Sequence, residues 1–127
     1  MDLVPVAGAV WHARRLRRIV NGKLLGEVLR GFHPHCYAIA MAHLDIAPES
    51  AAAEEEPADP ALRTLIQADG IDCLLAWTET LPAAIGARVK LKFPDEFSQS
   101  RSPGQLHRAI GPEIIRRVAA SLMHVAD

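Results

Sequence analysis

Three histidines and one cysteine give the most obvious candidate for chemistry in this sequence: His33, His35, Cys36 and His43. Imidazole and thiolate groups are the usual zinc ligands. On a helix, however, His35 and Cys36 point in different directions, and no second cluster with metal-binding spacing completes a tetrahedral set. We interpret these residues as capping and surface groups. A small metal- or thiol-dependent enzyme built on them is kept as an alternative.

Other signatures of catalysis are missing from the sequence. There is no G-x-S-x-G elbow, no C-x-x-C pair and no glycine-rich phosphate loop. Cys73 lies among leucine, alanine and tryptophan, where a thiolate is costly, so we expect it to pack in the core. The acidic run at 54–56 reads as a solvating segment. The sequence therefore predicts a protein that is not an enzyme, with no catalytic residue, no cofactor and no metal site.

An arginine-rich segment near the N-terminus suggests binding to a partner protein. In one helix, Trp11, Arg14, Arg15 and Arg18 follow the i, i+3, i+4, i+7 spacing and would share one surface. Tryptophan and arginine are enriched in interaction hot spots, so these four residues are the predicted partner-binding site. Two alternatives stay open. Trp11 could pack under another segment, or the arginines could bind nucleic acid in a regulatory protein, although a net charge of -1 gives no global basic field.

The elements that must position these groups are helices. A chain of 127 residues that is 50% apolar and 5% aromatic fits one domain with an aliphatic core. We predict a mainly α-helical domain with six or so helices, the first at 6–20. Its predicted buried face comprises Val6, Ala9, Val10, Ala13, Leu16 and Val20. Further helices are expected at 23–32 and 34–44. Residues 45–58, rich in alanine, glutamate and proline, predict a flexible linker between two helical halves.

In the second half of the chain, the spacing of apolar residues changes from a helical period to an alternating one. A helix starting at Pro60 is expected to break or bend at Asp69-Gly70, and Pro82 suits the first turn of a short helix. Residues 88–93 then alternate charged and apolar side chains, which predicts a short β-strand or hairpin. A helix is expected to restart at Gly111-Pro112, with an apolar face formed by Ile114, Ile115, Val118, Leu122 and Val125.

Cys36 and Cys73 are expected to be buried free thiols, as in a reducing compartment. No apolar run approaches the length of a membrane span, and the N-terminus lacks the basic region of a secretory signal. We therefore expect a cytoplasmic protein.

Two blocks of the sequence carry a family resemblance. GAVWHARRLRRIV followed by KLLGEVLRGFHPHCYAIAMAHL resembles the helices with glycine, histidine and a double arginine of the SctK/YscK family of type III secretion accessory proteins. LIQADGIDCLLAWTETLPAAIGARVKLKFP is similar to that family's apolar helix, proline-containing connection and R-x-x-L-x-L/F-P strand. Family members usually carry an additional N-terminal region, whereas Met1 here lies only a few residues before the first helix.

The resemblance implies a non-enzymatic role. SctK-like proteins are cytoplasmic components of the injectisome sorting platform, peripheral to the inner membrane. They link the cytoplasmic domain of the inner-membrane ring protein to the SpoA-domain protein. By this resemblance the expected partners are those two proteins, with no nucleic acid and no membrane insertion. No functional residue of the family is carried over to this chain.

Overall fold

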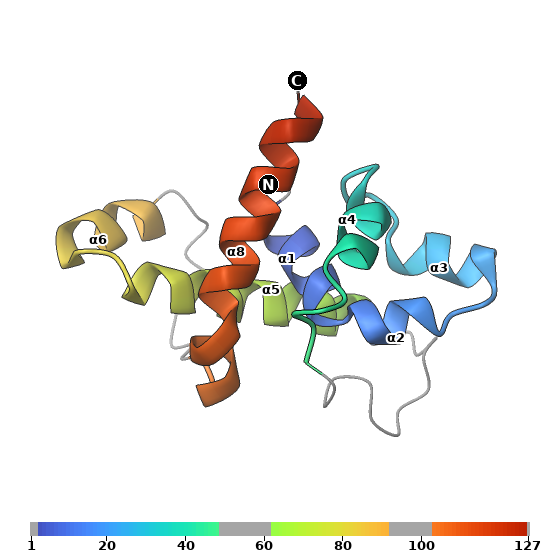
Figure 1. Cartoon of the computed structure of the whole chain (residues 1–127), viewed down its shortest axis with the longest axis horizontal. Coiled ribbons are helices and arrows are strands. Elements are labelled where there is room, and N and C mark those ends of the chain that lie inside the picture. Colours follow the sequence, from blue (N-terminus) through green and yellow to red (C-terminus); the bar gives the residue numbers. More distant parts are fainter. Residues whose placement is uncertain (1–2, 49–61, 92–102, 127) are drawn as a thin grey trace.

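The computed structural model describes residues 3–48, 62–91 and 103–126, and these residues form helices joined by turns (Figure 1). The helices are α1 (Leu3–Trp11), α2 (Ala13–Arg17), α3 (Gly22–Val28), α4 (Cys36–Ala42), α5 (Leu62–Glu79), α6 (Ala83–Leu91) and α8 (Gln105–Ala126). No strand occurs in the described ranges. The predicted mainly α-helical class is confirmed. None of these helices is both long and apolar enough to cross a lipid bilayer.

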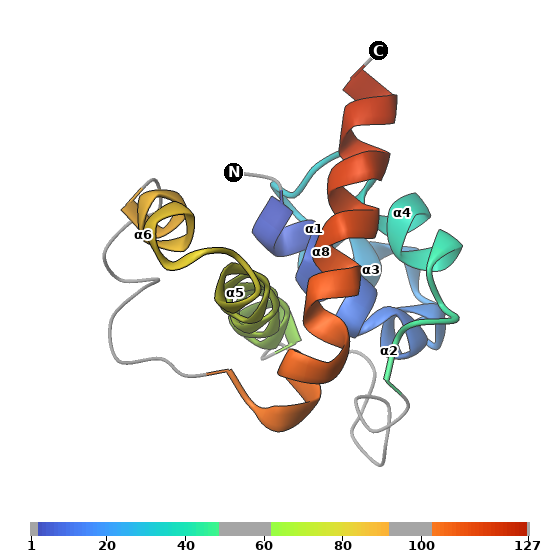
Figure 2. The ribbon, with the colours of Figure 1, turned by 60° about the vertical axis from the view of Figure 1, so that its left-hand side comes forward.

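Helix α5 is the centre of the fold. Helices α1 and α8 pack against it and against each other, and α4 packs on α1 (Figures 1 and 2). The core is almost entirely aliphatic, as the composition predicted. Its fully buried larger side chains include Val6, Val10, Leu16, Leu62, Ile66, Ile114 and Val118. Burying such side chains is the main favourable contribution to folding.

Two glycines allow α1 and α5 to cross in close contact. A methyl carbon added at Gly70 would lie 2.9 Å from the carbonyl carbon of Val4, and closer still to its oxygen. One added at Gly8 would lie 2.6 Å from the carbonyl carbon of Ile66. Gly111 of α8 likewise lies against the Cα atom of Cys73. Helix α5 is therefore approached closely by both of its main neighbours at positions without side chains.

Of the expected break or bend at Asp69-Gly70, the break is wrong, because α5 continues through both residues from Leu62 to Glu79. Glycine costs an isolated helix about 1 kcal/mol relative to alanine, but here the missing side chain is what lets α1 approach. The expected restart at Pro112 is wrong for a related reason. Helix α8 runs from Gln105 to Ala126 with Pro112 inside it, and packing on α5 keeps it helical.

The strand predicted at residues 88–93 is also wrong over its described part. Residues 88–91 form the last turn of α6, which follows Pro82 as expected, and Lys92 and Phe93 lie outside the described residues. Alternation over so few residues distinguishes strand from helix poorly. Arginine, lysine and leucine are also good helix formers, and they extend a helix that has already begun at Ala83.

The predicted helix at 6–20 is divided in two at His12. The inward positions from Val6 to Leu16 are confirmed as buried, but Val20 is 97% exposed, because α2 ends before it. Of the predicted linker at 45–58, only Asp45 to Pro48 are described. They form turns after α4, where Ala47 is buried and accepts a hydrogen bond from Arg14 Nε at 3.0 Å. The rest of that segment lies outside the described residues.

Candidate functional site

The four residues predicted to bind a partner do not share one exposed surface. Trp11 is 6% exposed and Arg15 only 1%, so both belong to the interior. Arg14 is half-buried, and Arg18 is exposed at the end of α2. The surface prediction is therefore wrong for Trp11 and Arg15. Partner binding through Arg14 and Arg18, or nucleic-acid binding by the same segment, stays a prediction.

The physical reason lies in what surrounds α1. Helices α4, α5 and α8 all pack on it, so both sides of its helical wheel are covered. The ring of Trp11 stacks on the ring of His107 from α8, with 4.1 Å between centroids and 9° between planes. The wheel separates two faces of a helix, but it does not show that both of them are buried. Packing of Trp11 under another segment was the alternative considered, and it is the one observed.

The histidine and cysteine residues considered for metal binding are not brought together either. The His33 and His35 rings lie 5.6 Å apart and tilted, and the backbone N–H of His35 donates to Nδ1 of His33. Nδ1 of His43 donates to the carbonyl oxygen of Ile39 at 2.8 Å. Cys36 is buried, as expected for a core thiol. The three histidines make these contacts within their own turns, and Cys36 packs in the hydrophobic core.

A different polar cluster lies where the α1–α2 turn, α5 and α8 meet, and sequence reasoning missed it. It consists of His12, Asp69, Asp72 and His107. Nε2 of His12 donates to Asp69 Oδ2 at 2.5 Å, and Nε2 of His107 donates to Asp69 Oδ1 at 2.9 Å. Asp72 Oδ2 lies 3.7 Å from the same His107 nitrogen. We call these four residues the His–Asp cluster.

The cluster is largely withdrawn from solvent. The side chains of His12, Asp72, His107 and Asp69 are 6%, 8%, 14% and 19% exposed. Desolvation alone raises the pKa of Asp69, but hydrogen bonds from His107 and His12 outweigh it and lower the pKa to about 2. Asp69 is therefore an ionised carboxylate at neutral pH, bound on both oxygens. It ties α5 to the α1–α2 turn on one side and to α8 on the other.

The neighbours of the cluster limit its chemistry. Among the described residues, Nδ1 of His12 and Nδ1 of His107 are buried without a hydrogen-bond partner, and both rings direct Nε2 into the cluster. Burial raises the pKa of the Cys73 thiol, and the charges of Asp69 and Asp72 raise it further. Cys73 is therefore a neutral core thiol beside the cluster, as expected, because a thiolate there is strongly disfavoured.

Three residues of the cluster present potential metal ligands to one another. Ligand atoms of Asp69, Asp72 and His107 all lie within 4.8 Å of one another, and no other such group of three occurs in residues 3–48, 62–91 and 103–126. The sequence carries one weak signal of this group. Asp69 and Asp72 are spaced i, i+3 in an apolar helix, which places two carboxylates on one face. The histidines come from distant segments.

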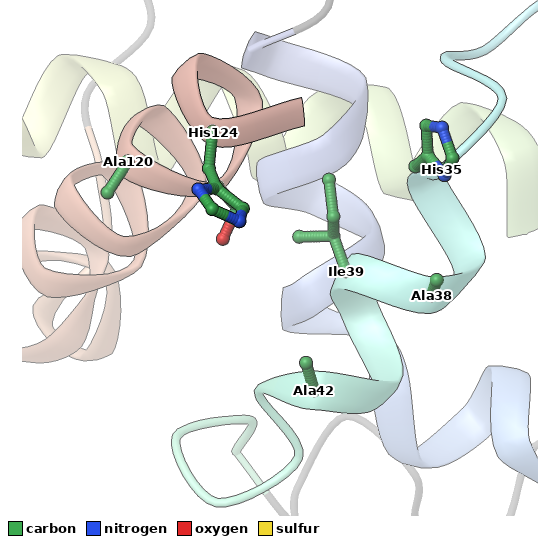
Figure 3. A pocket seen from close by; sticks show the side chains of 7 residues that line it. His35, Ala38, Ile39, Ala42, Ala120 and His124 are labelled. Atoms are coloured by element: carbon green, nitrogen blue, oxygen red, sulfur yellow. The ribbon is translucent and has the colours of Figure 1, made fainter. Parts of the chain in front are cut away.

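An open pocket of about 390 Å³ lies between α4 and α8 (Figure 3). It is lined by His35, Ala38, Ile39, Ala42, Ala120, Ser121 and His124. Figure 3 shows His124 and Ile39 on opposite sides of the opening. Four of these lining residues have small side chains, namely Ala38, Ala42, Ala120 and Ser121.

The fold and site thus describe a small helical domain with a buried His–Asp cluster. The chain is similar to nodulation protein NolU of Rhizobium fredii and to nodulation protein NolU of Sinorhizobium fredii, with 33% identity over 90 residues in each case. The match covers 70% of this chain but 41% of each relative, so the chain spans about two fifths of their length. No family model matches the chain, and no solved structure matches it.

Proposed function

We propose that this chain is a non-enzymatic structural adaptor of a type III secretion injectisome. It links the cytoplasmic domain of the inner-membrane ring protein to the SpoA-domain protein of the sorting platform. The observation that carries the proposal is the resemblance of two blocks of this sequence to the SctK/YscK family of type III secretion accessory proteins. It is joined by the 33% identity with nodulation protein NolU over 90 residues. The protein then acts in the cytoplasm, held at the inner membrane through the apparatus.

The helical body suits an adaptor in physical terms. An adaptor transmits position, so it needs a core that does not deform when either partner binds. Helix α5 suits this requirement, because α1 and α8 both cross it in close contact at glycines. Arg18, one of the four predicted partner-binding residues, is exposed at the end of α2, and the neighbouring Arg17 is exposed too. A surface of Arg17 and Arg18 is therefore a new hypothesis that keeps only Arg18 of the predicted site.

Co-purification tests the proposal directly. The chain is co-expressed with the SpoA-domain protein and with the cytoplasmic domain of the ring protein encoded near its gene. We expect a stable complex with at least one of them at physiological salt. If neither binds a chain that circular dichroism shows to be folded, the adaptor proposal is wrong.

A pair of variants then tests the arginine surface. Arg17→Glu with Arg18→Glu reverses two exposed charges, and Arg30→Glu reverses one exposed charge beyond the end of α3 as a control. Reversing charge at a binding surface slows association and weakens binding, whereas a charge elsewhere has little effect. Equal binding by both variants would remove the arginine surface from the proposal without affecting the adaptor role.

A further inference from the structure

The His–Asp cluster has the composition and spacing of a metal site, independently of the adaptor function. We propose that Asp69, Asp72 and His107 bind one divalent first-row transition metal ion, with Zn²⁺ as the reference ion. Imidazole nitrogen together with carboxylate oxygen is a donor set that suits zinc and its neighbours. Two ligands come from α5 and one from α8, so the ion would join the two longest helices of the domain.

The distances fit a zinc-sized ion. Zinc bonds to nitrogen and oxygen measure about 2.0–2.2 Å, and tetrahedral geometry then separates neighbouring donor atoms by roughly 3.3–3.5 Å. Nε2 of His107 lies 2.9 Å from Asp69 Oδ1 and 3.7 Å from Asp72 Oδ2, values on either side of that separation. The ligand atoms of all three residues lie within 4.8 Å of one another, so the carboxylates must rotate inward to reach bonding distance of one ion.

The ring of His107 faces both carboxylates, with Nε2 2.9 Å from Asp69 Oδ1 and 3.7 Å from Asp72 Oδ2. A divalent ion at that position contacts both carboxylates at once. His107 then carries its proton on Nδ1 and presents the Nε2 lone pair to the ion.

Surrounding groups hold the ligands in place. His12 is more than nine-tenths buried and directs Nε2 into the cluster, where it donates to the second oxygen of Asp69. Trp11 stacks on the ring of His107 and fixes its plane. Contacts of this kind orient metal ligands and contribute to affinity, usually by a factor of about 10–100. His12 and Trp11 are thus positioning residues of the proposed site.

Metal binding is measured on the purified full chain after treatment with EDTA, by titration calorimetry with Zn²⁺ and by metal analysis after dialysis. We expect one equivalent of zinc. Asp72→Asn and His107→Gln should abolish stoichiometric binding, and His12→Gln should weaken it about tenfold, as loss of an outer contact does. His35→Gln is the matched control, because His35 is an exposed histidine away from the cluster, and it should bind as wild type does.

A spectroscopic readout separates binding from folding. Trp77→Phe leaves Trp11 as the one tryptophan, stacked 4.1 Å from the His107 ring. Co²⁺ held by that ring should quench Trp11 fluorescence and show visible absorption bands of a low-symmetry site, and Zn²⁺ should reverse both effects. The proposal is overturned if folded wild-type protein binds no stoichiometric metal. Binding that survives in both Asp72→Asn and His107→Gln also overturns it.

Discussion

The close crossing of α1 and α5 gives the sharpest test of the fold, and it rests on Gly70. In Gly70→Ala the new methyl carbon would lie 2.9 Å from the carbonyl carbon of Val4, where ordinary contact begins at 3.4 Å. The backbones must therefore separate by at least the difference, 3.4 − 2.9 = 0.5 Å. The carbonyl oxygen of Val4 lies closer to the new methyl carbon and therefore requires a larger separation. Because the obstacle is backbone, no side-chain rotation relieves it.

The magnitude follows from two opposing effects. Overpacking a filled core costs typically about 1–3 kcal/mol, and a backbone clash belongs at the upper end or beyond. Alanine regains about 1 kcal/mol of helix propensity over glycine. We expect Gly70→Ala to lower the free energy of unfolding by about 2–3 kcal/mol. With a urea m-value of about 2 kcal/mol/M for a domain of this size, the midpoint falls by about 1 M.

Gly26→Ala is the matched control. Gly26 lies inside α3, and an added methyl carbon there meets nothing within 4 Å. The same substitution should therefore stabilise the protein, by up to about 1 kcal/mol through helix propensity alone. Both variants are compared with wild type by urea unfolding followed by circular dichroism. If Gly70→Ala is as stable as Gly26→Ala, the helices do not cross at Gly70 and the packing described here is incorrect.

Three further predictions concern charge and thiols. In the presence of EDTA, hydrogen bonds from His107 and His12 lower the pKa of Asp69, which lies beside Asp72. The ionised carboxylate of Asp69 therefore stabilises the fold above pH 4. About 2 kcal/mol of that stability should be lost as the pH falls toward about 2, and acid titrations of Asp69→Asn should lack this loss. Neither Cys36 nor Cys73 should react with Ellman's reagent in the native state, because both are buried, and both should react in urea. Native labelling would contradict their burial. Arg117→Gln should leave the thermal unfolding midpoint close to that of wild type despite the 2.9 Å contact with Asp45, since exposed ion pairs contribute little. A clear fall in the midpoint would show that the contact is shielded from solvent.

Most of the fold could be predicted from hydrophobic periodicity, where helices are long and have one buried face. Ile114, Ile115 and Val118 are buried as expected. Errors occurred where tertiary packing overrides local preference. Gly70 and Pro112 are helix breakers by propensity, yet both lie inside helices because the contact with a neighbouring helix outweighs the local cost. At residues 88–91 the alternating pattern is too short to specify a strand, and these residues extend helix α6.

The candidate site was harder to predict than the fold, because its residues lie far apart along the chain. Its chemistry depends on His12, Asp69 and His107, which are 57 and 38 residues apart along the chain and meet only through the packing of three elements. Spacing rules detect only ligands that lie on one helix or loop. They therefore indicated the neighbouring histidines and cysteine around His35 as the candidate metal ligands. A better signal was the cost of burying charge. Asp69 and Asp72 lie within an apolar helix, and carboxylates in such a position require partners that donate protons or hold a cation. His12 and His107 are such proton donors to Asp69, and the metal titration tests whether the His–Asp cluster also holds a cation.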